Sequence, residues 1–94
     1  MAYLTIVAKI KAMEDVVEVV RNELLKLIEP TRKEKGCLDY ILFQDNEDPS
    51  LFLFYENWET AEDLDRHMES EHFNACFDKI GNMISTEVHK ATKL

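Results

Sequence analysis

The stretch from Cys37 to Trp58 reads CLDYILFQDNEDPSLFLFYENW, and it decides the fold. Its two ends, 37–44 and 51–58, are rich in the branched and aromatic residues that strands favour. The residues between them, 45–50, are Asp, Asn, Glu, Asp, Pro and Ser, a composition typical of turns. We therefore predict a β-hairpin with strands at 37–44 and 51–58.

The segments before the hairpin predict a strand and then a helix. Residues 2–11 have the alternating pattern of a strand, in which one side carries Ala2, Leu4, Ile6, Ala8 and Ile10. Residues 13–29 have apolar side chains at helical spacing and charged side chains between them, which predicts an amphipathic helix of four to five turns. We expect Pro30 to end or bend this helix and Gly36 to mark its exit into the hairpin.

The segment after the hairpin contains two signals for the start of a helix. Thr60, with Asp63 three residues later, is a variant of the capping box, and Ser70 is a second candidate cap. The pattern predicts either one helix that bends near 69–71 or two short helices. Residues 86–94 return to an extended pattern.

The predicted order is strand, helix, strand, strand, helix, strand, which is the ferredoxin-like βαββαβ arrangement of the α+β class, with an antiparallel sheet. Its helices cover one face of the sheet. Both faces of the strand at 51–58 are nevertheless apolar, with Leu51, Leu53 and Tyr55 against Phe52, Phe54 and Trp58. We expect a second copy to cover the open face, so that a homodimer forms an α+β barrel.

Length and charge narrow the choice of function. The 94 residues predict a single domain over 1–94. With 11 basic and 19 acidic residues, the net charge of −8 argues against nucleic acid or an anionic membrane as partner. No apolar run approaches a membrane span or a secretory signal, and the two cysteines form no disulfide framework. We expect a cytoplasmic protein.

Glu56 and His67 are the candidate catalytic residues. Glu56 shares a strand face with Phe52, Phe54 and Trp58, and burial there would raise its pKa into the range of a general base. The commoner arrangement for such a carboxylate is an ion pair with a Lys or Arg. His67 borders an apolar stripe, where it would face a pocket as an acid or base, or else lie half-exposed.

Further residues are candidates for binding. Tyr55 and Asn57, opposite Glu56, and Tyr40 on the neighbouring strand would line a cavity with polar tips, or simply pack in the sheet. His72 and Cys76 have the spacing of a metal pair, but two ligands do not make a site, so no metal centre is predicted.

Several motifs resemble the antibiotic biosynthesis monooxygenase family, whose members are small dimeric α+β barrel proteins. The resemblance covers residues 3 to about 92 and is most specific at 54–73. It is carried by Gly36-Cys37-Leu38, Tyr40, Gln44-Asp45, Asp48-Pro49, Phe54-Tyr55-Glu56-Asn57-Trp58, Leu64, His67, Ser70 and His72-Phe73.

The resemblance implies more than one chemistry. Some members oxidise aromatic polyketides or quinols with molecular oxygen and without metal or flavin. A relative isomerises a phosphorylated autoinducer breakdown product, and another branch degrades haem with an Asn on the first strand, which residues 3–10 lack. The positions that match the family pattern are Glu56, Trp58, His67 and His72, and Trp58 would stack on a planar substrate.

We therefore predict a cofactor-independent monooxygenase that acts on a small aromatic or quinol-type molecule, with oxygen as co-substrate. Its catalytic residues would be Glu56 and His67, and its substrate-binding residues Trp58, Tyr55, Tyr40, Asn57 and His72. The alternatives are an isomerase of the autoinducer-breakdown type, which would need phosphate-binding cations such as Arg32, Lys33 and Lys35, and a non-catalytic dimeric binding or stress-response protein.

Overall fold

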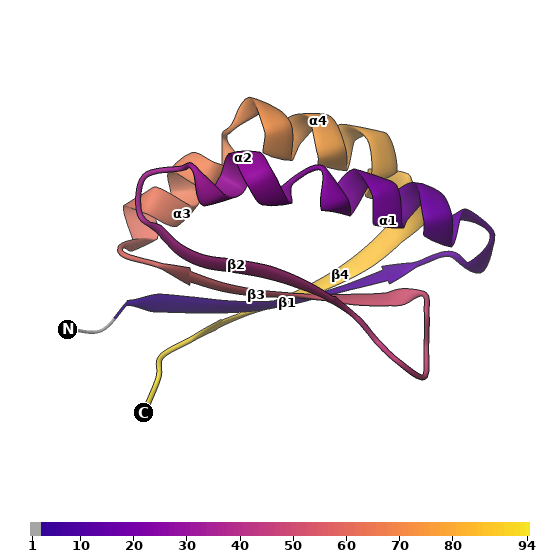
Figure 1. The fold of residues 1–94 in the computed structure, drawn as a ribbon, viewed down its shortest axis with the longest axis horizontal. Helices are drawn as coiled ribbons and strands as arrows, with labels where there is room; N and C mark the ends of the chain where they lie inside the picture. The colour runs from indigo at the N-terminus through magenta and orange to yellow at the C-terminus, as the bar shows by residue number, and fades with distance from the viewer. Residues whose placement is uncertain (1–2) are drawn as a thin grey trace.

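The computed structural model describes residues 3–94, whose four strands form one antiparallel sheet with helices packed on a single face (Figure 1). The strand order across the sheet is β2-β3-β1-β4, which confirms the predicted ferredoxin-like α+β fold. In chain order the elements are β1 (Leu4–Ala12), α1 (Val17–Leu25), α2 (Ile28–Arg32), β2 (Cys37–Gln44), β3 (Leu51–Trp58), α3 (Ala61–Met68), α4 (Glu71–Ile80) and β4 (Ile84–Ala91), with short 3₁₀ helices at Glu14–Val16 and Gly81–Met83.

The strands agree closely with the sequence prediction. Both strands of the hairpin have the predicted bounds. β1 extends one residue further than expected, to Ala12, and the predicted position of Ala2 lies outside the described residues. β4 starts at Ile84, two residues early, and ends at Ala91, three residues short of the predicted end.

The predicted helix over 13–29 is wrong in one respect, because the structure divides it into a 3₁₀ turn, α1 and α2. Pro30 explains the break between the two α-helices. Pro30 lies inside α2 rather than after the helix. In a regular helix its ring would clash with the backbone carbonyl of Lys26, four residues earlier, and it has no N–H group to donate to that carbonyl. The regular α-helical hydrogen bonding is therefore interrupted at 26–27, although both residues keep helical backbone angles.

The second helical region consists of two short helices, which was one of the two predicted possibilities. The side chain of Thr60 accepts a hydrogen bond from the backbone N–H of Asp63 and so caps α3. Ser70 caps α4 in the same way, by accepting from the backbone N–H of Phe73. Each cap satisfies a backbone donor that a helix start leaves free.

One row of residues runs across all four strands on the helix-covered face. Glu56 pairs with Tyr40 of β2 on one side and with Ile6 of β1 on the other, and Ile6 pairs in turn with Lys90 of β4. Directly opposite residues point to the same face of a sheet. The register therefore places a phenol, a carboxyl group and an amine under the helices.

The core lies between this face and the helices. It includes the fully or almost fully buried side chains of Val20, Leu24, Leu27, Phe52, Trp58 and Ile80. Within residues 3–94, none of the helices is both long enough and apolar enough to cross a membrane.

Gly36 fixes the turn between α2 and β2. Its φ of 83° lies in the left-handed region, which costs a residue with a Cβ atom roughly 1–2 kcal/mol. A Cβ atom at Gly36 would also collide with the carboxylate of Asp63 in α3. The turn therefore lies against α3 only because this residue has no side chain.

We predict that Gly36→Ala lowers the free energy of unfolding by more than about 2 kcal/mol, because the backbone strain and the collision add. Urea denaturation measures the change. Gly81→Ala is the matched control, since its φ of −55° is helical and a Cβ atom there has no neighbour within 4 Å. Equal stability of the two variants would contradict the prediction.

The other face of the sheet carries exposed apolar side chains. Ile41, Phe43 and Tyr55 are 36%, 51% and 40% exposed, and none of the helices described within residues 3–94 lies on this face (Figure 1). Val7 and Leu53 are half-buried on the same face. Such a contiguous apolar surface is unusual on a monomer and typical of a protein interface.

We predict that two copies pair through this face and form the barrel expected from the sequence. An obligate dimer of this kind buries about 2,000 Å² or more in total. Sedimentation at micromolar concentration should give twice the 11.0 kDa chain mass, and Phe43→Glu should shift the protein toward monomer. Val19→Glu is the control, because Val19 is a similarly exposed apolar residue on α1. A folded wild-type monomer would exclude the pairing.

Candidate active site

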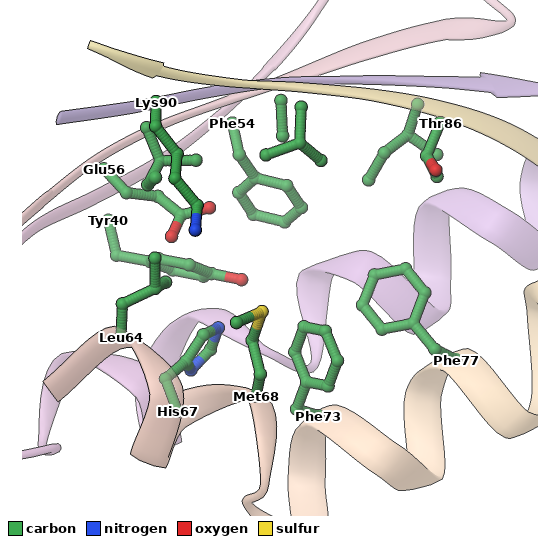
Figure 2. Close-up of a pocket in the computed structure, with 14 residues that line it drawn as sticks. Tyr40, Phe54, Glu56, Leu64, His67, Met68, Phe73, Phe77, Thr86 and Lys90 are labelled. Atoms are coloured by element: carbon green, nitrogen blue, oxygen red, sulfur yellow. The ribbon is translucent and has the colours of Figure 1, made fainter. Parts of the chain in front are cut away.

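A cavity of about 330 Å³ lies between the sheet and helices α3 and α4 (Figure 2). Its volume is at the lower end of the range of small-molecule sites. Most of its wall is apolar, with Ile6, Ala8, Ile10, Phe54 and Val88 from the sheet and Leu64, Met68, Phe73 and Phe77 from the helices. The polar side chains that reach it are Tyr40, Glu56, His67, Thr86 and Lys90.

Glu56 is the buried acid of this cavity. Its side chain projects from β3 toward the helices, and the residue is only 6% exposed. Its Oε1 atom accepts a hydrogen bond of 2.9 Å from Nε1 of Trp58. Among residues 3–94 it has no ion pair with a Lys or Arg, which was the structural alternative weighed for it.

Burial raises the pKa of the Glu56 carboxyl to about 7, although the hydrogen bond from Trp58 acts in the opposite direction. The negative charge of Glu34 raises this pKa further. A carboxyl group with a pKa near 7 is about half ionised at neutral pH. It can therefore accept a proton and later release it.

His67 lies beside Glu56 on the helical side of the cavity. Its Nδ1 atom is 2.7 Å from Oε2 of Glu34, a residue in the loop after α2. A carboxylate can only accept hydrogen bonds, so Nδ1 carries the proton. In Figure 2 the other ring nitrogen points toward the cavity. Burial lowers the pKa of His67 despite the hydrogen bond to Glu34, so the ring is neutral and offers a lone pair to the cavity.

Trp58 and Tyr40 hold these two groups in place. Trp58 is completely buried, and its ring packs against that of His67 with centroids 4.8 Å apart. It lies behind the cavity wall, where it contacts both Glu56 and His67. Tyr40 lines the cavity, with its ring between Phe54 and His67 at 4.8 and 5.5 Å. Burial raises the pKa of Tyr40, so its hydroxyl group stays protonated.

The remaining predicted binding residues lie elsewhere. Tyr55 and Asn57 are on the uncovered face, where the Asn57 side chain donates to Asp39 at 2.9 Å and to the Tyr55 hydroxyl at 3.0 Å. The structure therefore separates them from Tyr40. His72 lies outside the cavity, with Nε2 at 2.7 Å from Oε2 of Glu34.

Two residues of the site were missed by the sequence reasoning: Lys90, which lines the cavity, and Glu34, which lies behind His67. The alternating pattern of β4 would have identified Lys90. Every second residue of this strand, Thr86, Val88 and Lys90, points to the same face of the sheet and lines the cavity. Glu34 lies in a loop, and no sequence pattern connects it with His67, 33 residues later.

The raised pKa of Glu56 predicts a pH-dependent stability. The folded protein binds more protons at Glu56 than the unfolded chain does between the usual pKa of 4.5 and about 7, so stability falls as pH rises through this window. Glu56→Gln removes the titration. We expect the variant to gain stability relative to the wild type between pH 4 and pH 8, by on the order of 3 kcal/mol. Urea denaturation at both pH values measures this gain, and a pH-independent difference would contradict the assigned pKa.

Comparisons with known proteins give the family. The family model for antibiotic biosynthesis monooxygenase matches residues 3–79. Protein sll1783 of Synechocystis, which is uncharacterized, is 33% identical over 58 residues, and the match spans 62% of this chain but only 40% of that relative. Rv0793 of Mycobacterium tuberculosis, described as a candidate monooxygenase, is 29% identical over 83 residues, which are 88% of this chain and 81% of that protein.

A solved structure is similar to this chain in both sequence and fold. The crystal structure of PA3566 from Pseudomonas aeruginosa is 33% identical and superimposes with a TM-score of 0.96, over 100% of this chain and 96% of that one. Because the family model matches most of the chain, the protein belongs to the antibiotic biosynthesis monooxygenase family.

Proposed function

We propose that the protein is a cofactor-independent monooxygenase that oxidises a small aromatic or quinol-type molecule with molecular oxygen. Family membership supports oxygenase chemistry in general. The observation that carries the finer proposal is the Glu56 carboxyl group, which has a pKa of about 7 and lines an apolar cavity. A phenolic substrate needs such a base, because the anion gives up electrons to oxygen far more readily than the neutral phenol does.

The first step is proton transfer. The carboxylate of Glu56 takes a proton from a substrate hydroxyl group, whose O–H bond breaks while Glu56 becomes neutral. The substrate anion then supplies the electrons for the reduction of oxygen. In an anthrone-type substrate one oxygen atom replaces the two hydrogens of a CH₂ group, which becomes C=O, and the other oxygen atom leaves as water with those two hydrogens. Glu56 then returns its proton to the substrate oxygen, so the carboxylate is restored.

The other polar groups of the cavity can stabilise the substrate anion. Lys90 enters from β4 on the same face as Glu56, one strand removed from it, and its ammonium group favours negative charge on the substrate. The Tyr40 hydroxyl group can donate a hydrogen bond to a substrate oxygen, and His67 can accept one. Phe73 and Phe77 provide flat apolar surface for an aromatic ring.

The isomerase alternative needs cations for a phosphate group. Arg32 donates from Nε to the backbone carbonyl of Tyr40, and Lys33 pairs with Glu29. Neither of these nor Lys35 lines the cavity, where Lys90 is the basic residue. The cavity wall therefore suits a neutral planar molecule better than a phosphorylated one.

We predict enzyme-dependent oxygen uptake with members of a panel of hydroquinones and anthrone-type phenols, after correction for autoxidation. Glu56→Gln should lower kcat/KM by about 10²–10⁴-fold, the usual contribution of a general base. An oxygen electrode gives the rates. Glu59→Gln, a change at an exposed acid on the same segment, should leave the rate unchanged.

The pH profile and a second variant test the assignment. For the wild type, kcat/KM should rise with pH around an apparent pKa near 7, because Glu56 acts when ionised. His67→Ala should also lower the rate. Absence of oxygen uptake across the panel would exclude the oxygenase, and full activity in both Glu56→Gln and His67→Ala would exclude this catalytic pair.

A further inference from the structure

Three side chains converge on the side of His67 that faces away from the cavity. Glu34 comes from the loop after α2, His67 from α3 and His72 from the first turn of α4. A single oxygen of Glu34, Oε2, lies 2.7 Å from Nδ1 of His67 and 2.7 Å from Nε2 of His72. Taking one possible ligand atom from each residue, the three atoms lie within 4.8 Å of one another.

The charge of this cluster is not balanced by a basic residue. Within residues 3–94, the ion-pair partners of Glu34 are the two imidazole rings, without a Lys or Arg. The Glu34 side chain is only 16% exposed, which limits its compensation by water. The negative charge of this partly buried carboxylate is thus not compensated by a Lys or Arg side chain.

We propose that Glu34, His67 and His72 form a binding site for a divalent transition-metal ion such as Zn²⁺. Two imidazoles and one carboxylate are a common ligand set for zinc and related ions, whereas Mg²⁺ and Ca²⁺ prefer oxygen ligands alone. Glu34 and His72 lie beside the cavity, and His67 joins the cluster to the cavity wall. Metal binding can be tested whether or not the protein is an oxygenase. The proposed site differs from the His72–Cys76 pair considered from the sequence, because the Cys76 thiol points to the backbone carbonyl of Glu23.

Binding an ion requires the three ligand atoms, which lie within 4.8 Å of one another, to be rearranged around it. A tetrahedral zinc ion with bonds of about 2.0–2.1 Å holds its ligand atoms roughly 3.3 Å apart. Each nitrogen-to-carboxylate distance of 2.7 Å must therefore widen by about half an ångström as the ion replaces the shared protons. The His72 side chain is 26% exposed, which leaves a route for the ion and a free position for water.

Metal binding would change what His67 presents to the cavity. Without metal, Nδ1 carries the proton and donates to Glu34, so Nε2 offers a lone pair. An ion bound at Nδ1 needs the lone pair of that atom, so the proton of the neutral ring moves to Nε2. The ring stays neutral, but its cavity-facing nitrogen changes from an acceptor to a donor. The metal would thereby alter hydrogen bonding to a ligand in the cavity that it does not itself touch.

Titration calorimetry with Zn²⁺ on the metal-stripped full-length protein tests the site. We expect one ion per chain, and Co²⁺ should give the visible absorption bands of a four-coordinate site. His72→Ala and, separately, Glu34→Gln should each weaken Zn²⁺ binding by more than about 100-fold, since even the loss of an outer partner of a metal ligand costs 10–100-fold. Circular dichroism checks the fold of both variants.

Matched controls identify the ligands. His89→Ala removes an exposed histidine on β4, and Glu29→Gln removes an exposed acid on α2; both should bind Zn²⁺ as the wild type does. Glu56→Gln should also retain binding, so failure of the metal site and failure of the oxygenase proposal remain distinguishable. ¹⁵N NMR should show His67 changing to the Nε2-protonated form when Zn²⁺ is added. Absence of binding, unchanged binding in His72→Ala and Glu34→Gln, or an unchanged His67 tautomer would each overturn the proposal.

Discussion

The two-residue period of β3 is the constraint on which the rest of the structure depends. Because side chains alternate along a strand, Phe52, Phe54 and Trp58 can reach the core only if Glu56 does so too. A shift by one residue would bring Glu56 into solvent but would expose all three aromatic rings. The cost of one buried carboxyl group is smaller than the cost of exposing three rings, so the hydrophobic pattern keeps an ionisable group inside.

The same constraint explains which parts of the site could be predicted. The hairpin, the order of strands and helices along the chain and the two helix caps follow from local patterns in the sequence, and they carried the fold prediction. Glu56 was found because its neighbours on the strand face are aromatic, and this is a property of the sequence. Pro30 misled the prediction of the first helix, because proline is tolerated in the first turn of a new helix as well as at the end of an old one.

The rest of the site depends on contacts between distant segments. Tyr40 and Tyr55 look alike in the sequence, but only the register between β2 and β3 shows that Tyr40 pairs with Glu56 while Tyr55 faces away. The contact between Glu34 and His67 depends on the left-handed turn at Gly36, which brings the loop against α3. A glycine in the sequence indicates a turn, but it does not indicate which side chain the turn brings into contact with the neighbouring helix.

Glu56 and Glu34 are electrostatically connected, and this joins the cavity to the cluster behind it. The charge of Glu34 is one reason that the pKa of Glu56 is raised. A divalent cation at Glu34 would neutralise that charge, remove its repulsion and lower the pKa of Glu56. The same ion would turn the cavity-facing nitrogen of His67 into a donor. The two effects act on a substrate anion in opposite directions, since a more acidic Glu56 returns its proton to the anion more readily, whereas a donor at His67 stabilises the negative charge. Occupancy of the cluster would therefore adjust acid–base chemistry in the cavity through two carboxyl groups and one imidazole ring, without movement of the backbone.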